Sequence, residues 1–146
     1  MPTLRGNCHC GNIEVAFTTA LAPEQLRLRA CACSFCRRHG ARTTSDPKGH
    51  VEIIVHSERE LSRHRFGLRT ADFLICRRCG VYVGAVIAIG GNWYATLNVN
   101  TLDSEQSLGQ EAMTVSYEEE SASQRVLRRQ SHWTPATINV ASLPPS

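Results

Sequence analysis

Seven cysteines carry most of the chemistry that this sequence offers, and all of them fall into three short groups. Deprotonated cysteine sulfur is both a nucleophile and a zinc ligand, so clustered thiols indicate a metal site or a redox site. The number of cysteines is odd, and the first residues contain no apolar segment typical of a secretory signal. We therefore expect a reducing, cytoplasmic environment in which the thiols bind metal. The groups are Cys8-His9-Cys10, Cys31-Ala32-Cys33-Ser34-Phe35-Cys36 and Cys76-Arg77-Arg78-Cys79.

The spacing within each group indicates how the sulfurs can converge on an ion. In an extended segment, side chains two residues apart point to the same side, so Cys8 and Cys10 can face one ion. Cys76 and Cys79 enclose a tight turn followed by Gly80, as in a zinc knuckle. Seven cysteines divide most simply into four plus three, which predicts two zinc ions per chain. The closed tetrahedral site would consist of Cys8, Cys10, Cys76 and Cys79, and the second, local site of Cys31, Cys33 and Cys36.

The three-cysteine group leaves two possibilities for its fourth ligand. Zinc with three protein ligands keeps an open position for chemistry, whereas a fourth protein ligand closes the site. His39 follows the group closely and is the candidate for a closed structural site. Cys33 and Cys36 also precede His50 and His56 at a spacing close to that of a DNA-reading zinc finger. We reject that interpretation because such a finger carries both histidines on a helix, and the residues between these two are strand-like.

Short alternating segments indicate that β-strands position the cysteines. Polar and apolar residues alternate with the period of two that is typical of half-buried strands, and glycine, aspartate or proline separates most segments. Gly90-Gly91-Asn92 predicts a hairpin turn between the last two segments. The expected strands are Asn12–Thr18, Leu26–Ala30, Val51–Val55, Leu61–Phe66, Ala71–Cys76, Val81–Ile89 and Trp93–Val99.

Two helical segments are expected beside the strands. One is a short turn over residues 34–39, and the other is Ser121–Gln130, which begins with a capping box formed by Ser121 and Gln124. Pro135 and the proline-containing final residues predict an extended tail over residues 131–146. A chain of 146 residues fits one domain. We therefore predict a single, mainly β domain of short antiparallel strands with one peripheral helix near the C-terminus.

Composition and charge exclude several classes of protein. The chain has 16 lysines and arginines against 13 aspartates and glutamates, and a net charge of +3 does not by itself call for nucleic acid. The longest apolar run, Val81–Ile89, is far shorter than the roughly 20 residues that span a membrane. Hydrophobic residues make up 42% and charged residues 20%, a balance typical of folded globular chains. We therefore expect neither a membrane nor nucleic acid as a partner.

Three motifs around the cysteines resemble those of the glutathione-dependent formaldehyde-activating enzymes, whose domain is shared with centromere protein V. The resemblance covers roughly residues 6–103 and uses every cysteine. The segment Asn98–Asp103 resembles the one that follows these motifs in the family. The three motifs are Gly6–Ile13, Cys31–Ala41 and Phe73–Gly80.

The resemblance implies an Mss4-like β fold with two zinc ions, in agreement with the four-plus-three division. It implies a structural zinc on the four-cysteine group and a zinc at the active site on the three-cysteine group. It also implies carbon–sulfur lyase chemistry, in which S-hydroxymethylglutathione forms from glutathione and formaldehyde or breaks down to them. Three thiolates around zinc carry a net charge of −1. We expect the neighbouring Arg37 and Arg38 to offset that charge and to bind carboxylates of a glutathione-like ligand.

Two other functions remain open from the sequence. A non-catalytic, zinc-stabilised binding module is permitted by the relationship to centromere protein V, although the sequence lacks the long basic or low-complexity arm that would favour it. A thiol-based metal or redox protein would use Cys31, Cys33 and Cys36 and would lose one zinc on reversible oxidation. The favoured interpretation is an enzyme that acts on a small thiol and a small aldehyde.

Overall fold

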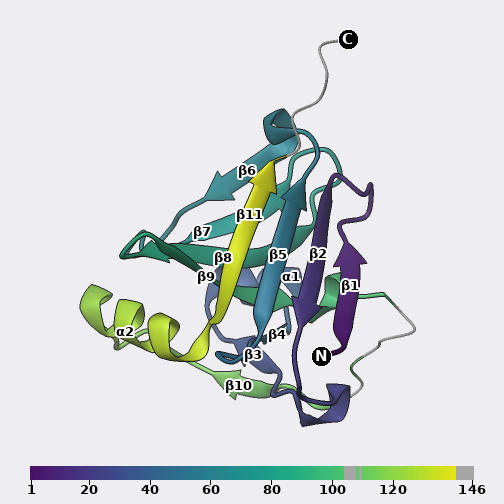
Figure 1. Ribbon diagram of the computed structural model, residues 1–146. Helices are drawn as coiled ribbons and strands as arrows, with labels where there is room; N and C mark the ends of the chain where they lie inside the picture. Colours follow the sequence, from purple (N-terminus) through teal and green to yellow (C-terminus); the bar gives the residue numbers. More distant parts are fainter. Residues whose placement is uncertain (104–107, 109, 141–146) are drawn as a thin grey trace.

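The computed structural model of the protein describes residues 1–103, 108 and 110–140, and within them eleven strands form one branched sheet (Figure 1). Two α-helices, α1 (Ser34–His39) and α2 (Ala122–His132), accompany the sheet. Three single turns of 3-10 helix occupy Pro23–Gln25, Glu58–Glu60 and Val99–Thr101. The strands are β1 (Thr3–Asn7), β2 (Ile13–Thr18), β3 (Arg29–Cys31), β4 (Thr43–Thr44), β5 (His50–Val55), β6 (Leu61–His64), β7 (Asp72–Cys76), β8 (Tyr82–Ile89), β9 (Asn92–Asn98), β10 (Met113–Val115) and β11 (Thr134–Val140).

The sheet follows the order β1-β2-β5-β11-β9-β4-β3-β10, and a branch of β8, β7 and β6 leaves from β9. Alternation of buried and exposed side chains explains why the central segments form strands. In β2, Ile13, Val15 and Phe17 are almost fully buried, whereas Glu14 between them is exposed. The same alternation in β5 buries Val51 and Ile53 opposite these residues, so the two strands share one apolar core. The mainly β class with a helix near the C-terminus is thereby confirmed.

The prediction of an extended tail over residues 131–146 is wrong for the described residues. Residues 131 and 132 close helix α2, and Thr134–Val140 form β11 between β5 and β9 in the middle of the sheet (Figure 1). Residues 141–146 lie outside the described part of the chain. The pairing of β11 with β5 is parallel, as is that of β10 with β3, so the sheet is mixed rather than wholly antiparallel.

Helix α2 begins where the capping box predicts. The Ser121 hydroxyl accepts a hydrogen bond from the backbone N–H of Gln124, and the Gln124 side chain accepts one from the N–H of Ser121. The helix packs against β8 and β9, and Trp133 at its end is buried with Ala85 and Ile87 of β8. This contact places the inner face of α2 beside the segment that carries the second cysteine group.

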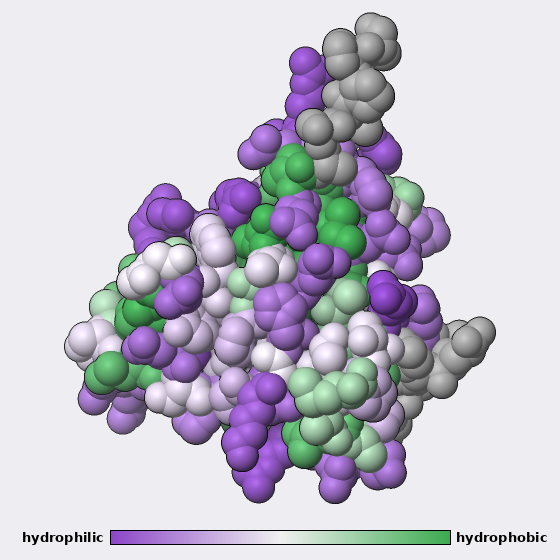
Figure 2. Space-filling model, viewed as in Figure 1, coloured by the Kyte–Doolittle hydropathy of each residue, from purple (hydrophilic) through white to green (hydrophobic). Residues whose placement is uncertain are grey.

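The surface seen in Figure 2 is mostly hydrophilic, and its hydrophobic residues lie in several small areas: where β5 and β11 end, at the left near α2, and at the lower right. Within the part of the chain that the structure describes, neither helix has the length and apolar character needed to cross a membrane.

Gly6 allows β1 to approach the turn after β9, and we expect Gly6→Ala to destabilise the fold. A Cβ atom at this position would press on the Thr101 carbonyl oxygen and lie 2.7 Å from Leu102 Cα, both of them backbone atoms. Overpacking of this kind costs about 1–3 kcal/mol, so the midpoint of urea unfolding should fall with little change in slope. The metal content of the folded variant should stay at the wild-type value, because Gly6 is not a ligand. An unfolding midpoint equal to that of the wild type would contradict the close approach.

Candidate metal centres and the cavity beside them

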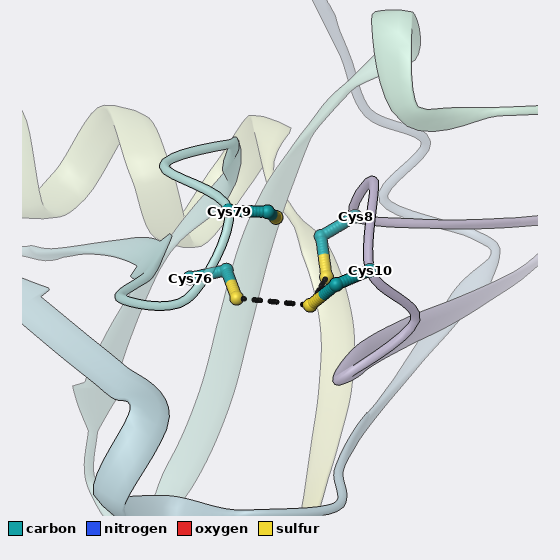
Figure 3. A group of neighbouring side chains, drawn as sticks. All are labelled: Cys8, Cys10, Cys76 and Cys79. Atoms are coloured by element: carbon teal, nitrogen blue, oxygen red, sulfur yellow. Dashed lines mark hydrogen bonds between the residues drawn. The ribbon is translucent and has the colours of Figure 1, made fainter.

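Four cysteine sulfurs from two segments that are far apart in the sequence lie close together (Figure 3). Cys8 and Cys10 lie in the turn between β1 and β2, and Cys76 and Cys79 lie at the end of β7 and in the turn that follows. The sulfur of Cys10 is 3.8 Å from that of Cys8 and 3.5 Å from that of Cys76, and all four sulfurs lie within 4.8 Å of one another. The four-cysteine group expected from the spacing is therefore brought together.

The geometry of this group fits a tetrahedral metal ion. Zinc–sulfur bonds of about 2.3 Å in tetrahedral geometry separate the sulfurs by about 3.8 Å, close to the distances found here. Gly80 has a φ of +79° and its N–H donates to the Cys76 carbonyl oxygen at 2.7 Å, which closes the turn that aims Cys76 and Cys79 at the same point. Burial raises the pKa of Cys8 and raises that of Cys76 to about 12. A cation is what would hold such buried sulfurs as thiolates.

The second group, Cys31, Cys33 and Cys36, is local. Cys31 ends β3, Cys33 caps the N-terminus of α1, and Cys36 lies within that helix. The backbone N–H of Cys36 donates to the Cys33 sulfur at 3.4 Å, and the three sulfurs lie within 4.8 Å of one another. Among the described residues, no histidine or carboxylate joins this group. His39 is exposed instead, with its ring 4.5 Å from that of Phe35.

Hydrogen bonds distribute the thiol protons unevenly within this second group. Contacts with the Cys31 and Cys36 thiols, together with the backbone N–H groups of Cys36 and Phe35, lower the pKa of Cys33 to about 2. The hydrogen bond with Cys33 raises the pKa of Cys31, and the hydrogen bonds with Cys31 and Cys33 raise that of Cys36. Soft thiolate donors in a group of three suit zinc and leave a tetrahedral ion one position short of closure.

A cavity of about 100 Å³ adjoins the three-cysteine group and includes all three of its cysteines in its wall. Aromatic side chains form much of the remaining wall, and they come from the loop after β6, from β7 and β8, and from the segments on both sides of α2. These aromatic residues are Phe66, Phe73, Tyr82, Tyr117 and Trp133. Tyr82 is buried, and burial raises its pKa well above the ordinary value, so its hydroxyl stays protonated.

The arginines of the cavity are not the ones that the sequence suggested. Arg37 and Arg38 are exposed on α1, and neither lies in the cavity wall, so their role in substrate binding stays a prediction. Four other arginines line it: Arg29, Arg125, Arg128 and Arg129. Three of them recur at helical spacing in the segment predicted to be a helix, which places them near one another on α2. The sequence therefore indicated that these three arginines lie close together on a helix, but it did not indicate where that helix packs.

The family of glutathione-dependent formaldehyde-activating enzymes has a sequence model that matches residues 3–119 of this chain. The chain is also similar to a Rhodobacter sphaeroides protein whose crystal structure is known, with 30% sequence identity and a TM-score of 0.54. That similarity covers 76% of this chain and 99% of the other. The family match contains all seven cysteines, and it ends before α2 and β11.

Proposed function

Because the chain belongs to the family of glutathione-dependent formaldehyde-activating enzymes, we propose that its three-cysteine group holds a zinc ion at which a small thiol and a small aldehyde are joined or separated. This is carbon–sulfur lyase chemistry, with S-hydroxymethylglutathione as the adduct that the family name suggests. The four-cysteine group holds a second zinc ion that serves the fold. The observation that carries the proposal is a three-thiol group, without a fourth ligand among the described residues, in the wall of a cavity.

The three-cysteine group fits zinc by its donor set. When bound there, zinc supplies an open position at which an added thiol ionises more readily. Cys31, Cys33 and Cys36 would hold the ion at the cavity wall, because β3 and the first turn of α1 fix all three of them there. His39, which would close the site, is turned towards Phe35.

The reaction needs a place where sulfur meets the carbonyl carbon away from bulk water. A carbon–sulfur bond forms, the carbonyl π electrons move to oxygen, and that oxygen takes up the proton lost by the thiol; the reverse reaction expels the aldehyde and returns the proton. The aromatic wall formed by Phe66, Phe73 and Tyr82 excludes water from this space. The arginines that line the same cavity would provide positive charge where oxygen becomes negative.

Cobalt substitution tests the open position directly. With cobalt in both sites, addition of glutathione should change the visible spectrum, because a fourth sulfur joins the metal of the three-cysteine group. His39→Ala should retain both cobalt ions and respond to glutathione as the wild type does. In Cys33→Ser, the glutathione-dependent change should disappear while the spectrum of the four-cysteine site remains.

The opposite pattern would contradict the proposal. A spectrum that is indifferent to thiols, together with loss of one metal ion in His39→Ala, would indicate a closed site of three cysteines and one histidine. If thiol binds, the zinc-loaded protein should also accelerate the exchange of formaldehyde between free thiol and adduct above the spontaneous rate. An unchanged exchange rate for every aldehyde tried would favour a non-catalytic zinc module.

A further inference from the structure

Four arginines line the cavity beside the three-cysteine group, although a neutral aldehyde carries no charge for them to bind. Arg125, Arg128 and Arg129 reach it from α2, and Arg29 reaches it from β3. The three arginines of α2 lie beyond residue 119, where the match to the family ends. They are therefore a property of this chain that the family match does not explain.

Only one of these arginines is paired with a carboxylate of the described residues. Arg128 donates from Nε to both carboxylate oxygens of Glu120 at 3.0 Å. The other three arginines donate hydrogen bonds to neutral groups: Arg29 to Ser45 Oγ at 3.1 Å, Arg125 to the Tyr117 carbonyl oxygen at 3.0 Å, and Arg129 to Thr70 Oγ1.

Arg129 is the most buried of the four, with an exposed fraction of 6%. Its Nε, like that of Arg125, is buried without a hydrogen-bond partner in the described part of the chain. Desolvation, with repulsion from Arg128 and Arg125, lowers the pKa of Arg129 to about 10, which still leaves it charged at neutral pH. A buried charge without a counter-ion is costly, so the arrangement is better explained by an anionic ligand than by stability.

The negative charge at the cavity comes from the metal-loaded cysteine group and from two glutamates. Three thiolates around a divalent cation carry one net negative charge. The acidic residues at the cavity are Glu118, which is exposed and part of its wall, and Glu120, which pairs with Arg128. A thiolate bound at the metal adds one more negative charge, so the formal charges around the cavity then balance. Arg29, Arg125 and Arg129 nevertheless have no carboxylate partner among the described residues, and a carboxylate of the ligand would supply one.

The volume of the cavity indicates whether the thiol or the aldehyde carries the carboxylate that the arginines bind. Pockets that enclose drug-sized ligands measure about 300–1,000 Å³, whereas this cavity measures about 100 Å³. A tripeptide such as glutathione is too large to lie wholly inside it, so most of the thiol stays outside, whereas a small carbonyl compound fits inside. Formaldehyde fits but carries no charge for the arginines to bind.

We propose that Arg29, Arg125 and Arg129 form a carboxylate subsite, and that the aldehyde of this enzyme is a short carboxylate-bearing one, with glyoxylate as its smallest member. The proposal rests on the proposed function of the three-cysteine group and specifies its substrate. The thiol sulfur bonds to the aldehyde carbon of glyoxylate, the carbonyl oxygen takes the thiol proton, and the carboxylate stays unchanged on the arginines. Charge-assisted hydrogen bonds to a planar guanidinium suit a carboxylate better than any neutral group.

A binding experiment without thiol tests the subsite independently of the reaction. Trp133 is part of the cavity wall, and the Arg129 guanidinium lies 4.9 Å from its ring centre, so its fluorescence reports on this site. Trp93→Phe leaves Trp133 as the sole tryptophan. In the zinc-loaded protein, glycolate should change the fluorescence saturably, and ethylene glycol, its neutral counterpart, should not.

Variants show whether the arginines hold the anion. Arg125→Gln and Arg129→Gln, each in the Trp93→Phe background, should weaken glycolate binding by about tenfold to a hundredfold. Arg27→Gln is the matched control, because Arg27 is exposed, lies two residues before Arg29 and is absent from the cavity wall. Carboxylates also bind zinc; unchanged affinity in a folded Arg125→Gln would place glycolate on the metal and overturn the proposal. Arg125 is only half-buried, so this variant serves if Arg129→Gln does not fold.

A kinetic experiment separates the subsite from the proposed function. With neutral 2-mercaptoethanol as the thiol, the wild type should accelerate exchange of glyoxylate more than that of formaldehyde, and Arg125→Gln should reduce the ratio of the two rates. Acceleration for formaldehyde alone, without glycolate binding, would overturn the subsite and keep the proposed function. Glycolate binding without acceleration for any aldehyde would keep the carboxylate subsite and overturn the proposed function. An Arg125→Gln defect that appears only with glutathione would assign the carboxylate to the thiol, which also overturns the proposal.

Discussion

Cys76→Ser is expected to yield protein without a cooperative fold, and this is the largest effect that we predict for a single substitution. The Cys76 sulfur is fully buried and meets Cys10, 66 residues away in the sequence, so a metal ion held there would join the β1–β2 turn to the β7–β8 turn. Structural zinc contributes about 10–16 kcal/mol of apparent binding free energy, comparable to the whole stability of about 5–15 kcal/mol of a typical domain. Far-UV circular dichroism, thermal melting and bound-metal analysis would measure the loss.

Arg78→Ser is the matched control for this prediction. Arg78 is exposed in the same turn and is not a ligand, so its replacement by the same residue should leave melting and metal content unchanged. Treatment of the wild type with a strong chelator should reproduce the Cys76→Ser phenotype. A Cys76→Ser protein that melts cooperatively at the wild-type temperature would contradict a metal-dependent fold.

Cys33→Ser is expected to remove one metal ion and all catalysis while the sheet remains. The three sulfurs of this group come from one short stretch, so a metal ion bound to them would close no long loop and would add little long-range constraint. β3 is still held by its pairing with β4 and β10. The variant should keep the wild-type β spectrum, bind one metal ion fewer, and exchange aldehyde at the spontaneous rate.

Ser34→Ala, at the exposed neighbouring residue, should behave as the wild type in all three measurements. If Cys33→Ser instead unfolds as completely as Cys76→Ser, the second metal serves the fold. The non-catalytic binding module would then be the better interpretation of this chain.

The three short cysteine groups were predictable because the spacing within each is local. Sulfurs two or three residues apart can reach a common point in only a few backbone conformations. That Cys8 and Cys10 meet Cys76 and Cys79 is not local, and it followed from the division of seven cysteines into four plus three. The capping box at Ser121 is equally local, since it requires only the first turn of the helix, and α2 begins there. The strands were recognisable where alternation was strong, as in β2.

The central place of β11 and the arginine subsite were not predictable in the same way. β11 pairs with β5 in parallel across more than eighty residues, for example Ile138 with Ile53, and a parallel partner leaves no turn signal in the sequence. Because the sequence does not predict β11, it also does not predict how α2 packs or that Arg129 faces the cavity. Arg37 adjoins the cysteines in sequence, but it is exposed on α1, and only the packing of the helix could reveal this.

The position of β11 has a consequence for how the chain is made. On the ribosome, the residues of β5 and β9 are synthesised well before residue 134. Both strands nevertheless lack one pairing partner until β11 has been made. Until then the nascent chain presents two unpaired strand edges, with Val51 and Ile53 of β5 among the residues of the future core. Folding of the whole sheet is therefore a late event that follows synthesis of the last described strand, and the growing chain needs protection from edge-to-edge aggregation up to that moment.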